Sequence, residues 1–200
     1  MKIILASNNK NKMREFRELL AGTDVEPISQ RDAGCDFEVD ETGTTFEENA
    51  FLKADAVLKA TGCIAVADDS GLVVDALNGE PGIYSARYGF GHDASDADRN
   101  RYLLGKLGDE KNRRARFVCC VCCCLPDGNT ITARGECEGE ILDVPRGSNG
   151  FGYDPLFRPL GYDVSMAELS ADEKNAISHR GKAMREFIEK FKRYYNGIDK

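Results

Sequence analysis

The sequence has no long apolar run and no basic stripe, and each absence argues against a class of protein. No apolar run approaches the roughly 18 residues needed to cross a membrane, and no secretory signal opens the chain. We therefore expect a cytoplasmic protein without membrane contact. The formal net charge is −7 and the basic residues form no stripe, which argues against nucleic acid as a partner. Repeats and low-complexity linkers are also missing, so a single domain spanning residues 1–200 is expected.

Cysteine is abundant, but its placement does not suggest a disulfide framework. Five of the eight cysteines lie within Cys119–Cys124. Adjacent side chains on a strand point to opposite faces, so this group cannot close a sensible set of bridges. Reduced thiols in the cytoplasm are the economical interpretation. The cysteines stand in a continuous apolar run, which favours a buried strand over a metal-binding thiol cluster.

Strands and helices alternate in the first half of the sequence, and a hairpin follows. Apolar spacing and stop signals predict strands at Lys2–Ala6, Val25–Ile28 and Cys63–Ala67, helices at Asn11–Leu20, from Thr45 to about Ala60 and at Asp96–Leu107, a hairpin of Arg116–Leu125 with Thr130–Glu138, and one last helix after Ser170. Thr45 and Ser170 each precede a glutamate by three positions, as in a capping box. This order predicts an α/β fold with a mixed sheet flanked by helices.

Polar residues follow the first strand and open the first helix: Ser7, Asn8, Asn9, Lys10, Asn11 and Lys12. A helix N-terminus presents free N–H groups and the positive end of a dipole, so it attracts phosphate, and the two lysines add positive charge. The segment is not a P-loop. Taken alone, it is better interpreted as an ordinary capped turn.

Two acidic pairs stand out, Asp40-Glu41 and Asp68-Asp69. We expect the second pair to end a strand, and ligands of open α/β sheets bind outside the carboxyl ends of strands. Adjacent carboxylates repel each other unless a cation neutralises them, and Mg²⁺ prefers carboxylate oxygens, water and phosphate. The alternative is that one aspartate caps a turn while the other is solvated.

A third candidate segment, Gly147–Asp154, interleaves three glycines with two aromatic residues. Such a loop allows close backbone approach beneath a stacked ring. Lys174, His179 and Arg180 supply basic groups further along the chain. A basic group with an aromatic, glycine-rich loop suits a purine nucleotide.

Six segments, in order and across nearly the whole chain, resemble the Ham1-like inosine/xanthosine triphosphate pyrophosphatases. They are Ser7–Lys12, Glu41–Ala50, Ala67–Leu72, Gly82–Tyr88, Phe151–Pro155 and Ser178–Gly181. Each is weak alone, but the ordered set is specific. The cysteine-rich strand departs from the resemblance, because ordinary aliphatic residues would be expected there.

The resemblance implies an elongated α/β fold of two lobes with the active site in a cleft between them, and a homodimer. It also implies Mg²⁺-dependent hydrolysis of deaminated purine nucleoside triphosphates (ITP, dITP and XTP) to the monophosphate and pyrophosphate, which removes them from the nucleotide pool. The implied roles are triphosphate binding by Ser7 to Lys12 with Lys53 nearby, general-base catalysis by Asp69, Mg²⁺ binding by Asp69 with Asp40 or Glu41, a nucleotide contact from Ser70, and base and sugar binding by Phe151, Gly152, Tyr153, Asp154, Lys174, His179 and Arg180.

Base choice is expected to depend on hydrogen bonds. A donor such as Arg180 or His179 would favour the C6 carbonyl of hypoxanthine over the amine of adenine. The sequence leaves open how guanine is excluded and whether ribose or deoxyribose is preferred. Alternatives are a related hydrolase of modified pyrimidine triphosphates, a nucleotide-sensing module without turnover, and a thiol-based redox or metal-storage protein built on Cys119–Cys124.

Overall fold

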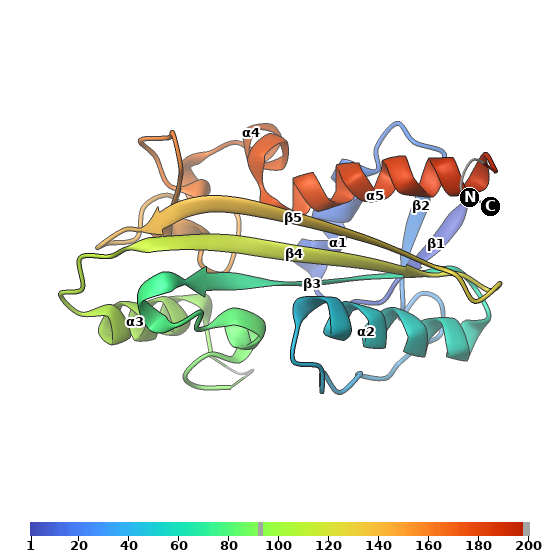
Figure 1. Cartoon of the computed structure of the whole chain (residues 1–200), viewed down its shortest axis with the longest axis horizontal. Helices are drawn as coiled ribbons and strands as arrows, with labels where there is room; N and C mark the ends of the chain where they lie inside the picture. Colours follow the sequence, from blue (N-terminus) through green and yellow to red (C-terminus); the bar gives the residue numbers. More distant parts are fainter. Residues whose placement is uncertain (92–93, 198–200) are drawn as a thin grey trace. The chain divides into compact units, whose positions relative to one another are not determined.

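The strands of the computed structural model, which describes residues 1–91 and 94–197, form a mixed sheet (Figure 1). The strand order is β2-β1-β3-β4-β5-β6; β1 runs parallel to β2 and β3, and β5 runs antiparallel to β6. The elements are β1 (Lys2–Leu5), α1 (Lys10–Leu19), β2 (Glu26–Ser29), α2 (Phe46–Thr61), β3 (Ala65–Val74), α3 (Asp96–Leu107), β4 (Arg114–Cys124), β5 (Thr130–Ile141), β6 (Phe157–Pro159), α4 (Ala171–Ile177) and α5 (His179–Tyr195). The predicted α/β class with a mixed, helix-flanked sheet is confirmed.

Contacts divide the chain into two compact units. The first comprises Met1–Asp69, Cys119–Gly135 and the C-terminal segment from Arg180, and the second comprises Ser70–Val118 and Glu136–His179. The strands β3, β4 and β5 contribute residues to both units. Within the described part of the chain, no helix has the length and apolarity needed to span a membrane.

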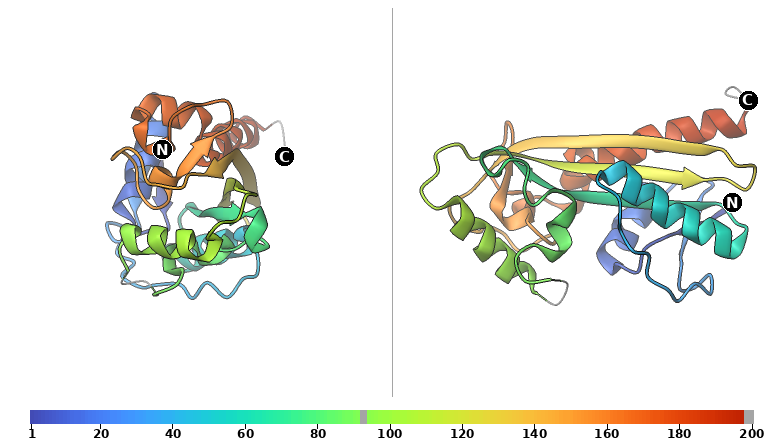
Figure 2. Two further views of the ribbon diagram at one scale, coloured as in Figure 1. Left: turned by 90° about the vertical axis from the view of Figure 1, so that its left-hand side faces the viewer. Right: turned by 60° about the horizontal axis from the view of Figure 1, so that its bottom comes forward.

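In the first unit, helices cover both faces of the sheet (Figures 1 and 2). On one face α1 and α5 pack on Ile3 and Leu5 of β1, together with alternate residues of β4. On the other face α2 packs on Ile4 of β1 and on Cys122 and Cys124 of β4. A strand that is buried on both faces reads as a continuous apolar run. The five cysteines of β4 are between 0% and 2% exposed, so the predicted buried strand is confirmed.

The second unit has its own apolar core. Leu103 and Leu107 of α3 pack in the same cluster as Leu72 of β3, Phe117 of β4 and Leu156, which directly precedes β6. The helix spans Asp96–Leu107, as predicted from the sequence. Its N-cap is Ser95, which accepts a hydrogen bond from the Asp98 amide in a complete capping box. The first turn of α3 is therefore held in place at its start.

The strand that carries the aspartate pair is longer than predicted. We expected it to end at Asp68-Asp69, but β3 continues to Val74, so that expectation is wrong. β1 is the strand that ends here: Leu5 pairs with Val66, and the chain then leaves the sheet for α1. The two aspartates consequently lie just beyond the carboxyl end of β1 while remaining in the middle of β3. Ligands of open α/β sheets bind outside the carboxyl ends of strands, and here the strand that ends beside the aspartates is β1 and not β3.

The C-terminal helix is also interrupted where one helix was predicted. α4 has Ser170 as its N-cap, with the predicted capping box, but Ser178 is extended with ψ near 155°. A second helix, α5, begins at His179. The break falls between Lys174, which lies in the second unit, and Arg180, which lies in the first.

Candidate active site

The turn between β1 and α1 is tied together by its own side chains. Asn9 is the N-cap of α1, and its Oδ1 accepts hydrogen bonds from the amides of Asn11 (2.9 Å) and Lys12 (3.1 Å). Ser7 Oγ accepts from the Asn9 amide at 3.2 Å. Of the predicted phosphate-binding residues, Asn8, Asn9 and Lys10 are exposed. Lys12 is different, because its ammonium group points to β3.

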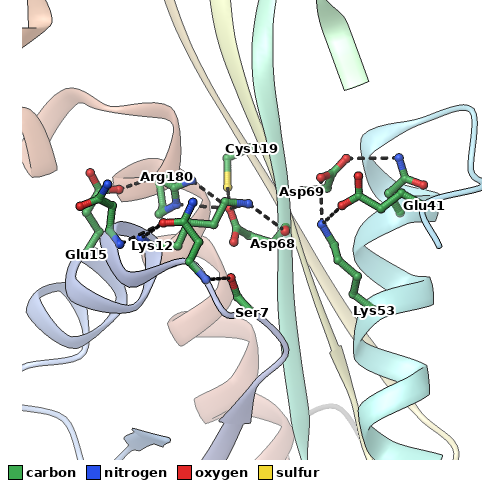
Figure 3. Close-up of polar contacts among 12 residues, drawn as sticks. Ser7, Lys12, Glu15, Glu41, Lys53, Asp68, Asp69, Cys119 and Arg180 are labelled. Carbon is green, nitrogen blue, oxygen red and sulfur yellow. Dashed lines mark hydrogen bonds and ion pairs between the residues drawn. The ribbon is translucent and has the colours of Figure 1, made fainter. Parts of the chain in front are cut away.

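The aspartate pair on β3 faces two different clusters (Figure 3). Asp68 points toward Lys12 and Arg180, and Asp69 points the other way, toward Lys53 of α2. This follows from strand geometry, because successive side chains alternate between the faces of a sheet. The mutual repulsion that led us to expect a metal between Asp68 and Asp69 is thus relieved in part by separate cations, one set on each face.

Asp68 is the centre of a buried charge network. Its side chain is fully buried, and its Oδ2 accepts from Lys12 Nζ at 3.2 Å and from Arg180 Nη2 at 3.0 Å. The Cys119 thiol lies 3.9 Å from the same oxygen. Arg180, whose side chain is 2% exposed, also pairs with Glu15 of α1. Burial alone would raise the pKa of Asp68, but Lys12 and Arg180 hold it well below its usual range.

The second cluster joins two carboxylates through one ammonium group. Lys53 Nζ donates to Asp69 Oδ1 at 2.9 Å and to Glu41 Oε1 at 2.8 Å. Burial of Lys53 would lower its pKa, but the two acids raise it above the usual value. Burial raises the pKa of Asp69, although Lys53 and Lys12 oppose this effect. Asp69 is therefore more basic than an ordinary aspartate and has a charged neighbour.

Asn49 holds this cluster in place, and the sequence analysis gave it no role at the site. It is fully buried on α2, one turn before Lys53, and its Nδ2 lies 3.4 Å from Asp69 Oδ2. Its Oδ1 accepts from the Gly43 amide at 2.9 Å. A Cβ at Gly43 would lie 2.7 Å from that oxygen, so glycine is needed for this approach. A buried polar residue one turn before a predicted site lysine was the signal that could have revealed it.

The donor set of this cluster suits a hard divalent cation. Glu41 and Asp69 direct one oxygen each at a single positive group, which is the ammonium of Lys53 in this structure. Carboxylate oxygens are the protein ligands that Mg²⁺ accepts, usually with water and phosphate in the remaining positions. Asp40, the other acid considered, is exposed. Among the described residues, no group of three or more histidines, cysteines and acids is arranged to hold a metal by itself, so a cation here would need ligands from substrate or water.

The predicted base-binding residues of the second unit also come together. Asp154 Oδ2 accepts from the Phe151 amide (2.9 Å) and from Lys174 Nζ (2.7 Å), and both charged side chains are buried. Lys174 Nζ lies 5.0 Å from the centroid of the Phe151 ring. Tyr153 donates its hydroxyl proton to the Ser85 carbonyl at 2.9 Å. These contacts shape the loop around an aromatic ring and one buried cation.

The remaining predicted residues lie apart from these contacts. His179 is buried and stacks on Phe117, with ring centroids 4.7 Å apart and ring planes 14° from parallel. Ser70 follows Asp69 on β3 and is partly buried. Arg180 belongs to the first unit, in the Asp68 network described above. Sequence reasoning gave Glu15 and Cys119 no part in the Asp68 network; the apolar spacing of the first helix predicts an outward Glu15, whereas its side chain is buried.

Comparisons with known proteins agree with this architecture. A sequence model of the Ham1 family matches residues 3–190. A dITP/XTP pyrophosphatase of Bacillus anthracis is 48% identical over 199 residues, covering 98% of each chain, and one of Deinococcus deserti is 52% identical over 182 residues, covering 91% of this chain and 85% of the relative. The Ham1 protein of Staphylococcus aureus superposes with a TM-score of 0.84 at 44% identity over the full length of both chains. A HAM1 protein from Coxiella burnetii gives 0.85 at 43% identity, covering 93% of this chain and 95% of the other. Because the family model matches nearly the whole length and the relatives are about 50% identical, the chain belongs to the Ham1 family.

Proposed function

We propose that this protein hydrolyses deaminated purine nucleoside triphosphates, such as ITP, dITP and XTP, to the monophosphate and pyrophosphate. The observation that carries the proposal is the Glu41–Lys53–Asp69 cluster, in which one lysine bridges two acids. The substrate class is supported by relatives named dITP/XTP pyrophosphatases, which are 48% and 52% identical in sequence over nearly the full length.

Asp69 is proposed as the general base. Water that attacks the α-phosphorus must lose a proton, and a positioned carboxylate accelerates such a step by roughly 10²–10⁴-fold. Burial raises the pKa of the Asp69 carboxyl, although Lys53 and Lys12 oppose this effect. Lys53 holds Oδ1 at 2.9 Å and Asn49 approaches Oδ2, so the orientation of the carboxylate is fixed before substrate arrives.

Mg²⁺ is proposed as the cofactor, with Glu41 and Asp69 as its protein ligands. When bound, the ion supplies a positive charge that neutralises phosphate oxygens and stabilises the charge that develops during displacement. Lys53 already places a positive charge between the same two acids. When a divalent cation binds between these acids, the ammonium group of Lys53 either stays beside them or turns toward a phosphate.

The phosphate end of the nucleotide is proposed to contact the first turn of α1. The side chains of Asn8 and Lys10 are exposed there, and the helix N-terminus favours an anion. Lys12, whose ammonium group contacts Asp68 and so holds β3 against the turn, is proposed to add positive charge for the phosphates. The base is proposed to bind at Phe151 and Lys174, with His179 and Arg180 as further candidates.

A homodimer in the cytoplasm is the assembly and location that we propose from the family resemblance. Light scattering on the purified protein would measure the first. Localisation of the tagged chain in cells would measure the second.

The test is pyrophosphate release from a panel of nucleotides, with Mg²⁺ and with a chelator. The panel contains ITP, dITP, XTP, GTP, ATP, dUTP and dTTP. Turnover confined to ITP, dITP and XTP, and abolished by the chelator, is the expected result. A preference for the pyrimidine nucleotides would favour the rival hydrolase, and nucleotide binding without pyrophosphate release would favour a sensing module.

The Asp69→Asn variant tests the base, because it keeps the size of the side chain and removes its basicity. It should lower kcat by roughly 10²–10⁴-fold. Asp40→Asn, at an exposed neighbouring acid, is the matched control. Wild-type turnover in Asp69→Asn would remove Asp69 from the mechanism.

A further inference from the structure

The loop that carries Phe151 is held from outside by the first turn of α3. Asp96 Oδ2 accepts a hydrogen bond from the Gly152 amide at 2.6 Å, and Asn100 Nδ2 donates to the Gly152 carbonyl at 3.1 Å. The two side chains are four residues apart, so they lie on the same face of the helix. The N–H and the C=O of Gly152 are thus both hydrogen-bonded to side chains on neighbouring turns of α3.

The conformation of this glycine sets the direction of the loop. Gly152 has a φ of +64°, in the left-handed region, and no atom lies within 4 Å of the place where a Cβ would stand. Glycine adopts this region readily, and the hydrogen bonds from Asp96 and Asn100 hold the peptide in place. Phe151 precedes it and Tyr153 follows it, so a rotation at Gly152 would move both aromatic rings.

Burying the Asn100 side chain costs stability, and its packing in the core does not account for the choice of a polar residue. It is 5% exposed, and its Oδ1 has no hydrogen-bond partner within the described ranges 1–91 and 94–197. An unsatisfied buried oxygen destabilises a protein, so an apolar residue would serve the core better. The carboxamide does make one contact that an apolar residue could not, which is the bond to the Gly152 carbonyl.

Asp96 is held in turn by its own helix. Its second oxygen, Oδ1, pairs with Arg99 Nη2, and Arg99 Nη1 donates to the Ala94 carbonyl. The carboxylate is therefore oriented before it meets Gly152. The anchors of the loop itself, from Asp154 to the Phe151 amide and to Lys174, act on the other side of the same glycine.

We propose that Asp96 and Asn100 are positioning residues for nucleobase binding: by holding the Gly152 peptide they set the place of the Phe151 ring against Lys174. This inference rests on the proposed function. Neither residue needs to touch the nucleotide. Their loss should weaken binding of the base and its discrimination, while the chemistry at Asp69 continues at the same rate.

The experiment measures KM and kcat for ITP and ATP in four variants of the full chain. Asp96→Ala removes the acceptor for the Gly152 amide, whereas Asp96→Asn keeps an oxygen there and should restore most of the binding. Asn100→Asp keeps the shape but replaces the donor with an acceptor facing a carbonyl. Arg101→Ala, at a largely exposed arginine on the same helix, is the matched control.

The expected result is that KM for ITP rises roughly 5- to 50-fold in Asp96→Ala and Asn100→Asp, with kcat within about twofold of wild type. The ratio of kcat/KM for ITP to that for ATP should fall in the same two variants. Asp96→Asn and Arg101→Ala should stay near wild type in both quantities.

Three outcomes would overturn the inference. KM for ITP could stay within twofold in both disruptive variants; kcat could fall while KM holds; or Asp96→Asn could be as impaired as Asp96→Ala. Melting temperatures recorded on the same samples identify a variant that has merely lost stability, and a loss of activity that follows melting across the set counts against positioning. If wild type itself releases no pyrophosphate from ITP, the proposed function fails, and that failure is separate from the failure of the inference.

Discussion

Replacing Arg180 with methionine should destabilise the first unit strongly. The guanidinium group of Arg180 pairs with Asp68 at 3.0 Å and also with Glu15, and all three side chains are at most 6% exposed. Methionine has a similar length and no charge, so the variant leaves two buried carboxylates with less compensation. Such a change tests whether the buried arginine has a structural role before any role in reading a base.

The magnitude follows from what remains in the cluster. Removing one partner of a buried ion pair costs about 3–5 kcal/mol, because the other charge stays buried. Lys12 still lies 3.2 Å from Asp68, so that carboxylate keeps a cation, and the loss falls mainly on Glu15. We therefore expect the lower end, about 3 kcal/mol. For a chain of 200 residues this is a fall in Tm of roughly 6–12 °C.

Urea unfolding at neutral pH gives the free energy, with a second variant as the internal check. In the Arg180→Met background, Glu15→Gln removes the charge that has lost its partner, so the double variant should be more stable than Arg180→Met by about 1 kcal/mol or more. A loss below 1 kcal/mol in the single variant, or no recovery in the double variant, would refute the reasoning. The ratio of ITP to ATP turnover, measured well below the melting temperature, then shows separately whether Arg180 reads the base.

Three further predictions concern the metal, pH and the cysteine strand. Glu41→Gln should raise the Mg²⁺ concentration for half-maximal activity by about tenfold or more, whereas Asp40→Asn, at an exposed position, should leave it within twofold; equal effects would contradict the assignment of Glu41. Because the folded state holds the pKa of Asp68 below its usual range, the unfolded chain takes up this proton first as pH falls below about 4. Wild type should therefore lose unfolding free energy more steeply there than Asp68→Asn, and parallel urea profiles between pH 5 and 3 would disprove this. Cys123→Ser should cost about 1–2 kcal/mol, because it buries a hydroxyl in an apolar layer, while Cys63→Ser at an exposed position should change stability by less than about 0.5 kcal/mol in urea unfolding.

Much of the fold was predictable because the local signals agreed with the tertiary contacts. The run around Cys119–Cys124 is apolar at every position, and the strand is buried on both faces. Ser95 caps α3 where the helical pattern begins, and Thr45 caps α2. In each case the residues that define the element also stabilise it, so no distant partner was needed to recognise it.

The errors have a common physical origin in distant partners. A run of two aspartates was interpreted as the end of a strand, since charged residues are costly inside a sheet. Lys12, Lys53 and Arg180, from three separate parts of the chain, lower that cost, and β3 continues through both acids. The break between α4 and α5, where Ser178 is extended, was also missed, because the sequence around it reads as helical.

The candidate site was predictable in its residue types and less so in its contacts. The sequence pointed to the two adjacent aspartates, but it did not show that Asp68 contacts Lys12 and Arg180 while Asp69 contacts Lys53. Some polar groups of the site have a role that depends on a partner elsewhere in the chain. Examples are the hydrogen bond between Asn49 and Gly43 and the bond from the Gly152 amide to Asp96 of α3. A single sequence without its partners does not distinguish such residues from ordinary polar positions.

The alternation of a β-strand explains how one aspartate pair can serve two purposes. Asp68 is fully buried, carries two strong cation contacts and has a depressed pKa, so protonating it is difficult and moving it would break the fold of α1 against β3. Asp69 is one residue away on the opposite face, with a raised pKa and a lysine that also contacts a second acid. In the mechanism that we propose, the ionised Asp68 fixes the strand beside the residue that accepts the proton, and that residue, Asp69, has a raised pKa where Asp68 has a lowered one. This division requires the pair to lie inside a strand; in a solvated loop both aspartates would share one environment, and the difference between their pKa values would vanish.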